Sequence, residues 1–141
     1  EGIAIDRSDL RSQLVMIDNA VHMIEKGRNM AIFPEGTRNR NPELTLGEFK
    51  PGALKLSYRT GAPILPCAIY GTSRPLSSKS HLKVYPLWVR FFSPLSKDEF
   101  LQYNTTYLAP KMQSDIQAEI FNSMMKQDKI YLEALQASKK K

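Results

Sequence analysis

The stretch FPEGTR, residues 33–38, directly follows the short apolar run Met30-Ala31-Ile32. A short apolar run bounded by proline and glycine is typical of a buried strand that ends abruptly. We therefore expect a strand over residues 30–33. An acid, a glycine, a hydroxyl and an arginine occupy the next four positions, so this stretch predicts where a strand stops and a polar loop begins.

The polar half of this stretch has the chemistry of a phosphate site. Gly36 lets a ligand approach the backbone closely, Thr37 offers a hydroxyl and an N–H, and Arg38 carries a planar set of donors that binds phosphate bidentately. Glu35 cannot attract an anion, so we expect it to orient the arginine or a substrate hydroxyl. The alternative is a polar surface loop with one ion pair, which would contribute little to stability.

The residues before this stretch predict a strand, a helix and a second strand. Residues 2–6 form a short apolar segment, and Gly27 ends a pattern of apolar residues spaced three or four apart, which is typical of an amphipathic helix. The members of that pattern are Leu10, Leu14, Ile17, Val21 and Ile24. Such a unit is parallel and right-handed, and ligands bind at the carboxyl ends of its strands. We expect Arg7, after the first strand, to join Arg38 at one site.

The remainder of the chain predicts further short strands and helices. In order, these are a short helix from Pro51 to Gly61, a strand over Ile64–Tyr70, two strand pieces within residues 82–92, a helix capped by Ser96, and a long helix after Pro110. The expected fold class is α/β, a single domain with a mixed, mostly parallel sheet flanked by helices.

The composition limits the class of protein. A length of 141 residues is about one domain, and 42% hydrophobic residues suffice for a packed core. No apolar run approaches the roughly 18 residues of a membrane span. Cys67 stands alone, which excludes an intrachain disulfide and favours a reducing compartment. The spacing of His, Cys and Asp residues indicates no metal site.

The net charge of +6 lies mostly within residues 28–93. This field suits an anionic headgroup, the phosphates of coenzyme A, an acidic carrier protein or an anionic membrane surface. It would also attract nucleic acid, but the chain has neither zinc spacing nor an RNA-binding aromatic signature, so we expect no nucleic-acid partner. Lys50 either contributes to phosphate binding or is a solvated surface lysine.

Four segments of the chain resemble, in order, sequence blocks of the glycerolipid acyltransferases, a family that includes the lysophosphatidate acyltransferases. These segments are GIAIDR (residues 2–7), FPEGTR (residues 33–38), GEFKPGA (residues 47–53) and APILPCAI (residues 62–69). The resemblance covers roughly residues 1–92. It implies phospholipid biosynthesis: acyl transfer from acyl-CoA or acyl carrier protein to the free hydroxyl of a lysophospholipid such as 1-acylglycerol-3-phosphate, which forms phosphatidate.

The family's first block, His-x4-Asp, has no counterpart here. That block supplies the catalytic base, whereas Gly27 stands five residues after His22 and Pro86 five after His81. We therefore expect residues 1–141 to be the C-terminal portion of a single acyltransferase domain whose N-terminal part is missing. The isolated chain is then expected to be inactive.

The resemblance also implies roles for individual residues. Glu35 would support catalysis, and the acceptor would be bound by Arg7, Gly36, Thr37, Arg38 and Lys50. No cofactor is expected beyond the acyl thioester, which is a co-substrate. The expected location is the cytoplasmic face of a membrane, peripheral or anchored through the missing segment.

Two other functions stay open from the residues alone. One is a non-catalytic lipid- or phosphate-binding module that has lost the base. The other is a phosphate-binding domain of unrelated chemistry.

Overall fold

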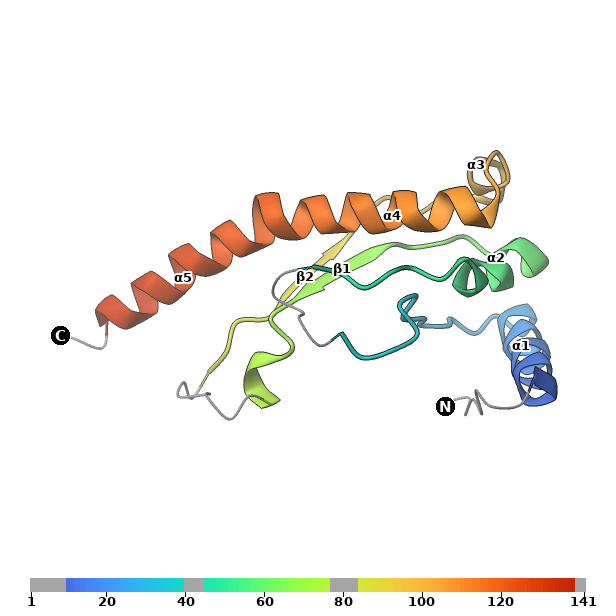
Figure 1. The fold of residues 1–141 in the computed structure, drawn as a ribbon, viewed down its shortest axis with the longest axis horizontal. Helices are drawn as coiled ribbons and strands as arrows, with labels where there is room; N and C mark the ends of the chain where they lie inside the picture. Colours follow the sequence, from blue (N-terminus) through green and yellow to red (C-terminus); the bar gives the residue numbers. More distant parts are fainter. Residues whose placement is uncertain (1–9, 40–44, 77–83, 139–141) are drawn as a thin grey trace.

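A computed structural model describes residues 10–39, 45–76 and 84–138 of the chain. Its elements are α1 (Leu10–Glu25), η1 (Pro51–Leu54), α2 (Lys55–Thr60), β1 (Cys67–Tyr70), η2 (Arg74–Leu76), β2 (Trp88–Phe91), α3 (Lys97–Phe100), α4 (Thr105–Glu119), the π-helical turn η3 (Ile120–Met124) and α5 (Met125–Ser138). Figure 1 shows α4, η3 and α5 as one long helix along one side of the molecule, with β1 and β2 beside its middle and α1 and α2 toward one end.

The long helix begins at Thr105, earlier than predicted, and Pro110 lies inside it. Asn104 caps the helix, and its side chain accepts a hydrogen bond of 2.8 Å from the Tyr107 N–H. Proline in the second turn removes one backbone hydrogen bond. Burial of Leu108 and Ala109 on the first turns offsets that loss. The prediction of a start after Pro110 was wrong because it ignored the cap.

The core forms along one stripe of the long helix. The predicted spacing of four residues is confirmed: Met112 is partly buried, and Ile116, Ile120 and Met124 are buried. The core residues from the rest of the chain that pack in the same cluster are Phe49, Leu54, Ala68, Tyr70 and Phe100. Each large apolar side chain contributes on the order of 1.5–3 kcal/mol when buried, before entropy is counted.

The sheet of the described residues is a two-stranded antiparallel pair. Ile64 and Leu95 extend it by one bridge, with N–H to O distances of 3.0 and 2.8 Å, so the predicted strand over Ile64–Tyr70 is present but interrupted. Pro66 lacks an N–H and accounts for the interruption. Within the described ranges, the expected mostly parallel sheet is not seen.

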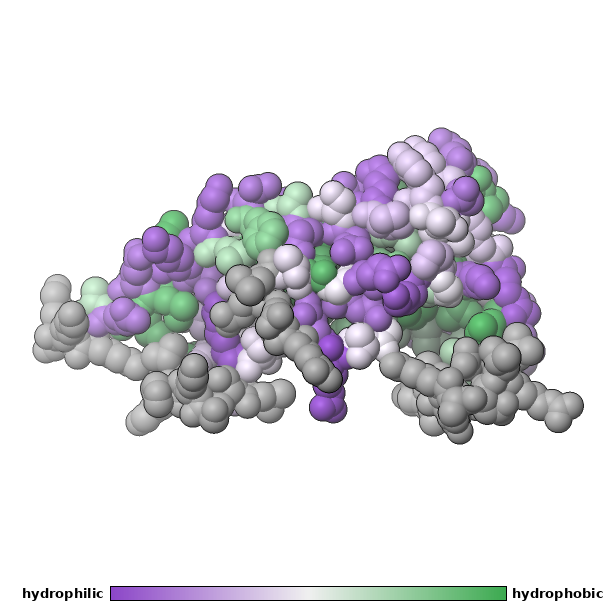
Figure 2. All heavy atoms as spheres, in the orientation of Figure 1, coloured by the Kyte–Doolittle hydropathy of each residue, from purple (hydrophilic) through white to green (hydrophobic). Residues whose placement is uncertain are grey.

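The two faces of this sheet differ in burial. Ala68 and Tyr70 are buried on the face toward the long helix. On the opposite face Ile69, Val89 and Phe91 are exposed by 41%, 47% and 64%. This second face is therefore apolar, and among the described residues no element covers it. In the view of Figure 2, hydrophilic side chains dominate the surface along the long helix, and hydrophobic atoms appear there in small patches.

The predicted strand over residues 30–33 is wrong for this structure. The segment is not paired as a strand, and Ile32 and Phe33 are exposed by 43% and 79%. A strand needs a neighbour for its backbone hydrogen bonds. The expected partner, residues 2–6, lies outside the described residues, as does Arg7.

Local helix signals are confirmed. Gly27, with φ 77°, ends α1 by donating to Ile24 O at 2.8 Å, while Arg28 N–H donates to Met23 O at 3.0 Å. Gly61 likewise ends α2. Ser96 caps α3 through Glu99, as predicted. Of the helices described, none combines the length and the apolar character needed to cross a membrane.

A buried ion pair joins α5 to the loop after β1. Asp128 is 3% exposed and accepts two hydrogen bonds of 2.6 Å from Arg74 and one of 2.9 Å from the Trp88 indole. Arg74 also donates to the Tyr70 hydroxyl at 3.1 Å. Burial would raise the pKa of Asp128, but the hydrogen bonds from Arg74 and Trp88 and the arginine's charge hold that pKa below its ordinary value.

We expect Asp128→Ala to lower the free energy of unfolding by about 3–5 kcal/mol, because it removes the buried carboxylate that accepts hydrogen bonds from the largely buried Arg74 guanidinium and the Trp88 indole. Urea denaturation measures the loss. The stabilisation from Asp128 is present above the carboxyl's unfolded pKa and is lost as pH falls through its folded pKa. The matched control is Asp115→Ala, which breaks an exposed pair with Lys111 and should cost about 1 kcal/mol or less. Equal losses would contradict a buried, coupled pair.

Candidate anion-binding site

The stretch over residues 33–38 forms a tight turn. Gly36 has φ 66°, in the left-handed region, and its N–H donates to Phe33 O at 3.0 Å. Glycine adopts this conformation without the steric cost that other residues incur. Thr37 and Arg38 follow the turn and are exposed to solvent. The turn thus presents a hydroxyl and a guanidinium at the surface.

A second segment, residues 46–50, holds this turn from one side. Lys50 N–H donates to Pro34 O at 2.9 Å, and Gly47 N–H donates to Glu35 Oε2 at 2.6 Å. A Cβ on Gly47 would overlap the Glu35 carboxylate, so the carboxylate would have to move for a side chain to fit there. The turn and the segment are therefore fitted to each other at this point.

The long helix holds the same segment from the opposite side. Leu46 N–H donates to Gln117 Oε1 at 2.5 Å, and Phe49 N–H donates to Gln113 Oε1 at 3.1 Å. The Phe49 side chain is buried in the core. Sequence reasoning missed both glutamines. Their spacing of four residues beside the apolar stripe was the one available signal.

The structure brings most of the predicted site residues together. Glu35, Gly36, Thr37 and Arg38 share the turn, and the Lys50 backbone contacts it through Pro34. The Lys50 side chain forms an exposed ion pair with Glu48, 2.6 Å long. Arg7 lies outside the described residues, so its expected meeting with Arg38 stays a prediction.

The described residues also bear on nucleophilic and metal chemistry. Burial raises the pKa of the Cys67 thiol on β1, which disfavours the reactive thiolate. His22 is exposed on α1. Across residues 10–39, 45–76 and 84–138, no three His, Cys, Asp or Glu side chains are grouped to hold a metal ion.

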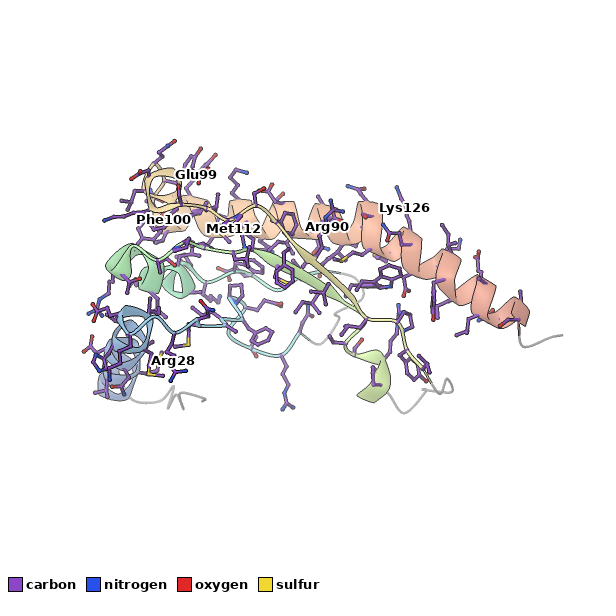
Figure 3. All side chains as sticks on the ribbon, turned by 180° about the vertical axis from the view of Figure 1, so that it is seen from behind. Arg28, Arg90, Glu99, Phe100, Met112 and Lys126 are labelled. Atoms are coloured by element: carbon purple, nitrogen blue, oxygen red, sulfur yellow. The ribbon has the colours of Figure 1, made fainter. Side chains whose placement is uncertain are left out.

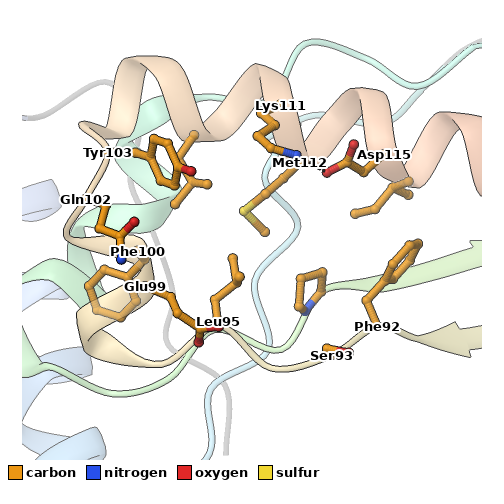
Figure 4. Close-up of a pocket in the computed structure, with 13 residues that line it drawn as sticks. Phe92, Ser93, Leu95, Glu99, Phe100, Gln102, Tyr103, Lys111, Met112 and Asp115 are labelled. Atoms are coloured by element: carbon orange, nitrogen blue, oxygen red, sulfur yellow. Dashed lines mark hydrogen bonds and ion pairs between the residues drawn. The ribbon is translucent and has the colours of Figure 1, made fainter.

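A separate cavity of about 490 Å³ lies beside α3 and the first half of α4. Met112 and Leu95 point into it, and Lys111 and Asp115 form an ion pair of 2.8 Å at its edge (Figure 4). None of its lining residues belongs to the turn or to residues 46–50.

Arg90, on β2, reaches α4, where its guanidinium donates to the Glu119 carboxylate at 3.0 Å (Figure 3).

Comparison with known proteins identifies the family. The family model described as Acyltransferase matches residues 1–70. A probable 1-acyl-sn-glycerol-3-phosphate acyltransferase of Mycoplasma pneumoniae is 31% identical over an alignment of 122 residues, which covers 81% of this chain and 45% of that protein. The chain belongs to the acyltransferase family. The resemblance found in the sequence is thereby confirmed.

Two further acyltransferases extend the comparison. The 1-acyl-sn-glycerol-3-phosphate acyltransferase of Borreliella burgdorferi is 38% identical over 71 residues, 50% of this chain and 28% of that protein. The crystal structure of PlsC, the 1-acyl-sn-glycerophosphate (LPA) acyltransferase of Thermotoga maritima, matches with a TM-score of 0.56 and 21% identity. That match covers 77% of this chain and 44% of PlsC and shows a similar fold. The chain spans less than half the length of its relatives from Mycoplasma pneumoniae and Mycoplasma genitalium.

We expect Gly36→Ala to destabilise the acyltransferase chain by roughly 1–2 kcal/mol, because alanine must adopt the left-handed conformation there. Nothing lies within 4 Å of the added Cβ, so the cost is one of backbone strain alone. Urea denaturation measures it. Gly52→Ala is the matched control: that position is equally open but has no positive φ, and the change should be neutral or stabilising by about 0.4–1 kcal/mol. Equal effects at the two glycines would contradict the strain argument.

Proposed function

We propose that the protein carrying this chain transfers an acyl group from an acyl thioester to the free hydroxyl of a lysophospholipid such as 1-acylglycerol-3-phosphate, which forms phosphatidate. The observation that carries the proposal is the FPEGTR turn, in which left-handed Gly36 presents exposed Thr37 and Arg38 in a chain of the acyltransferase family. The names of the relatives support the same substrate class.

The turn would bind the phosphate of the acceptor. Arg38 offers two parallel N–H donors, Thr37 a hydroxyl, and Gly36 an open approach to the backbone. Each charge-assisted hydrogen bond is worth about 1.5–3 kcal/mol. Arg7 and Lys50 are proposed to complete the site. A fixed headgroup would orient the acceptor hydroxyl toward the thioester. Such positioning lowers part of the activation barrier of the reaction.

The reaction also needs a general base. The hydroxyl oxygen bonds to the thioester carbonyl carbon, the carbon–sulfur bond breaks, and the thiol leaves with a proton. A positioned base typically contributes about 10²–10⁴-fold to such a step. His22, exposed on α1, lacks the aspartate of a His-x4-Asp block. We propose that the base is a residue outside residues 1–141, acting from a longer protein.

The surroundings of the proposed reaction follow from its substrates. The donor is acyl-CoA or acyl carrier protein, with no further cofactor. The acceptor is a lipid, so the proposed place is the cytoplasmic face of a membrane, and the net charge of +6 supports contact with anionic headgroups. A mostly parallel sheet in the longer protein is part of the same proposal.

We expect Arg38→Ala, in a longer protein that carries this chain and is active, to raise the KM for the lysophospholipid by about tenfold or more, because one charge-assisted contact is lost. The KM for the thioester should be unchanged, and Arg38→Lys should be intermediate because lysine cannot bind bidentately. Steady-state kinetics with each substrate varied in turn measures the split. Arg90→Ala, an exposed arginine on β2, is the control. Equal changes for both substrates would remove the phosphate assignment.

We expect purified residues 1–141 to bind glycerol 3-phosphate, followed by NMR titration, without transferring an acyl group. Turnover by this chain alone would show that a residue within it acts as the base. Phosphate binding by the longer protein without any acyl transfer would favour the alternative, a non-catalytic lipid- or phosphate-binding module.

A further inference from the structure

We propose that Glu35 is a positioning residue: its carboxylate holds the Gly47 backbone N–H and thereby fixes the Gly36–Arg38 turn in its anion-binding shape. The inference rests on the proposed function, because it assigns the turn to the acceptor's phosphate. The sequence predicted that Glu35 orients Arg38 or a substrate hydroxyl. In this proposal its partner is instead the backbone N–H of Gly47, 12 residues away.

The first argument is that, within the part of the chain that the structure describes, few contacts hold the turn. Ile32 and Phe33, which lead into it, are exposed by 43% and 79%, so packing contributes little there. Its described contacts with residues 46–50 are two hydrogen bonds, from Lys50 N–H to Pro34 O at 2.9 Å and from Gly47 N–H to Glu35 Oε2 at 2.6 Å. Glu35 directly precedes Gly36, so the second bond acts on the residue that sets the turn.

The second argument is the fit between the two residues. A Cβ on Gly47 would collide with Glu35 Oε2 and would lie 3.2 Å from Cδ and 3.3 Å from Cγ of the same side chain. The carboxylate therefore occupies the space that a side chain on Gly47 would need. Gly47 has no positive φ, so a side chain there would strain no backbone; its Cβ would instead displace the Glu35 carboxylate from its present position.

The third argument is that the held segment is itself anchored. Gln117 and Gln113 of α4 accept hydrogen bonds from Leu46 and Phe49, and Phe49 is buried in the core. Residues 46–50 thus connect the long helix to the turn. Glu35 is the side chain that completes this connection, so its loss would loosen the turn while leaving the Lys50 to Pro34 bond, the helix and the core in place.

The test compares Glu35→Ala, Glu35→Gln and Gly47→Ala in a longer, active protein. Glu35→Ala should raise the KM for the lysophospholipid at least about tenfold with the KM for the thioester unchanged, because the side chain that accepts the Gly47 N–H is lost. Glu35→Gln should stay within about threefold of wild type, since its amide oxygen still accepts from the Gly47 N–H. Glu133→Ala, an exposed glutamate on α5, is the matched control and should change neither KM.

Gly47→Ala supplies the decisive comparison. In the wild-type background Gly47→Ala should raise the KM for the lysophospholipid, because the new Cβ displaces the Glu35 carboxylate. In the Glu35→Ala background the same change should raise this KM much less, because the carboxylate is already gone. Additive losses would overturn the proposal. So would a Glu35→Gln variant as impaired as Glu35→Ala, since charge would then be the property that matters.

A second measurement separates this inference from the proposed function. In hydrogen-exchange NMR of residues 1–141, the Gly47 amide proton should exchange slowly in the wild type and in Glu35→Gln, whose side-chain oxygen still accepts it, and fast in Glu35→Ala. If the longer protein transfers no acyl group, the proposed function fails while this protection still decides the contact. A Gly47 amide that exchanges equally in the wild type and in Glu35→Ala overturns the inference even where the enzyme is active.

Discussion

The burial of one stripe of the long helix is the constraint on which the rest of the described structure depends. Ile116, Ile120 and Met124 lie on that stripe, and the short elements of the chain pack against it in turn. A helix of this length presents a long apolar stripe, so elements far apart in the sequence can pack at successive points along it. The antiparallel strands and the segment after the FPEGTR turn take their places in this way.

Polar side chains on the flanks of the same helix then set the loops. Gln113 and Gln117 hold residues 46–50, and Asp128 holds Arg74 in the loop after β1. Among the described residues, every buried side-chain nitrogen and oxygen has a partner, so these contacts leave no uncompensated polar group. The apolar stripe does not by itself specify where the loops lie. Hydrogen bonds from polar side chains at particular positions along the helix specify it.

The candidate site follows from this arrangement. Thr37 and Arg38 of the turn are exposed, and the turn is shaped by Gly36 and by the hydrogen bonds that Pro34 O and the Glu35 carboxylate accept from the backbone of residues 46–50. In the proposed function, this short loop on an anchored segment would contribute to binding of the acceptor's phosphate, while a base elsewhere would act on the acceptor's hydroxyl. The uncovered apolar face of β1 and β2 shows that the described residues alone leave one side of the sheet unpacked.

The sequence by itself determined the features that arise within a few residues of one another. It predicted the end of α1 at Gly27, the capping of α3 by Ser96, the apolar stripe, and the family motif whose turn carries Arg38. Each is governed by local backbone geometry or by helical periodicity, which a sequence displays directly.

Only the tertiary structure decided which distant groups meet. The bond from Gly47 to Glu35, the bonds from residues 46–50 to α4, and the pairing of Arg74 with Asp128 join positions 12 to 71 residues apart. The unpaired state of residues 30–33 has the same origin. Strand pairing and buried ion pairs depend on which chain segment lies alongside, and no spacing within the sequence encodes that neighbour.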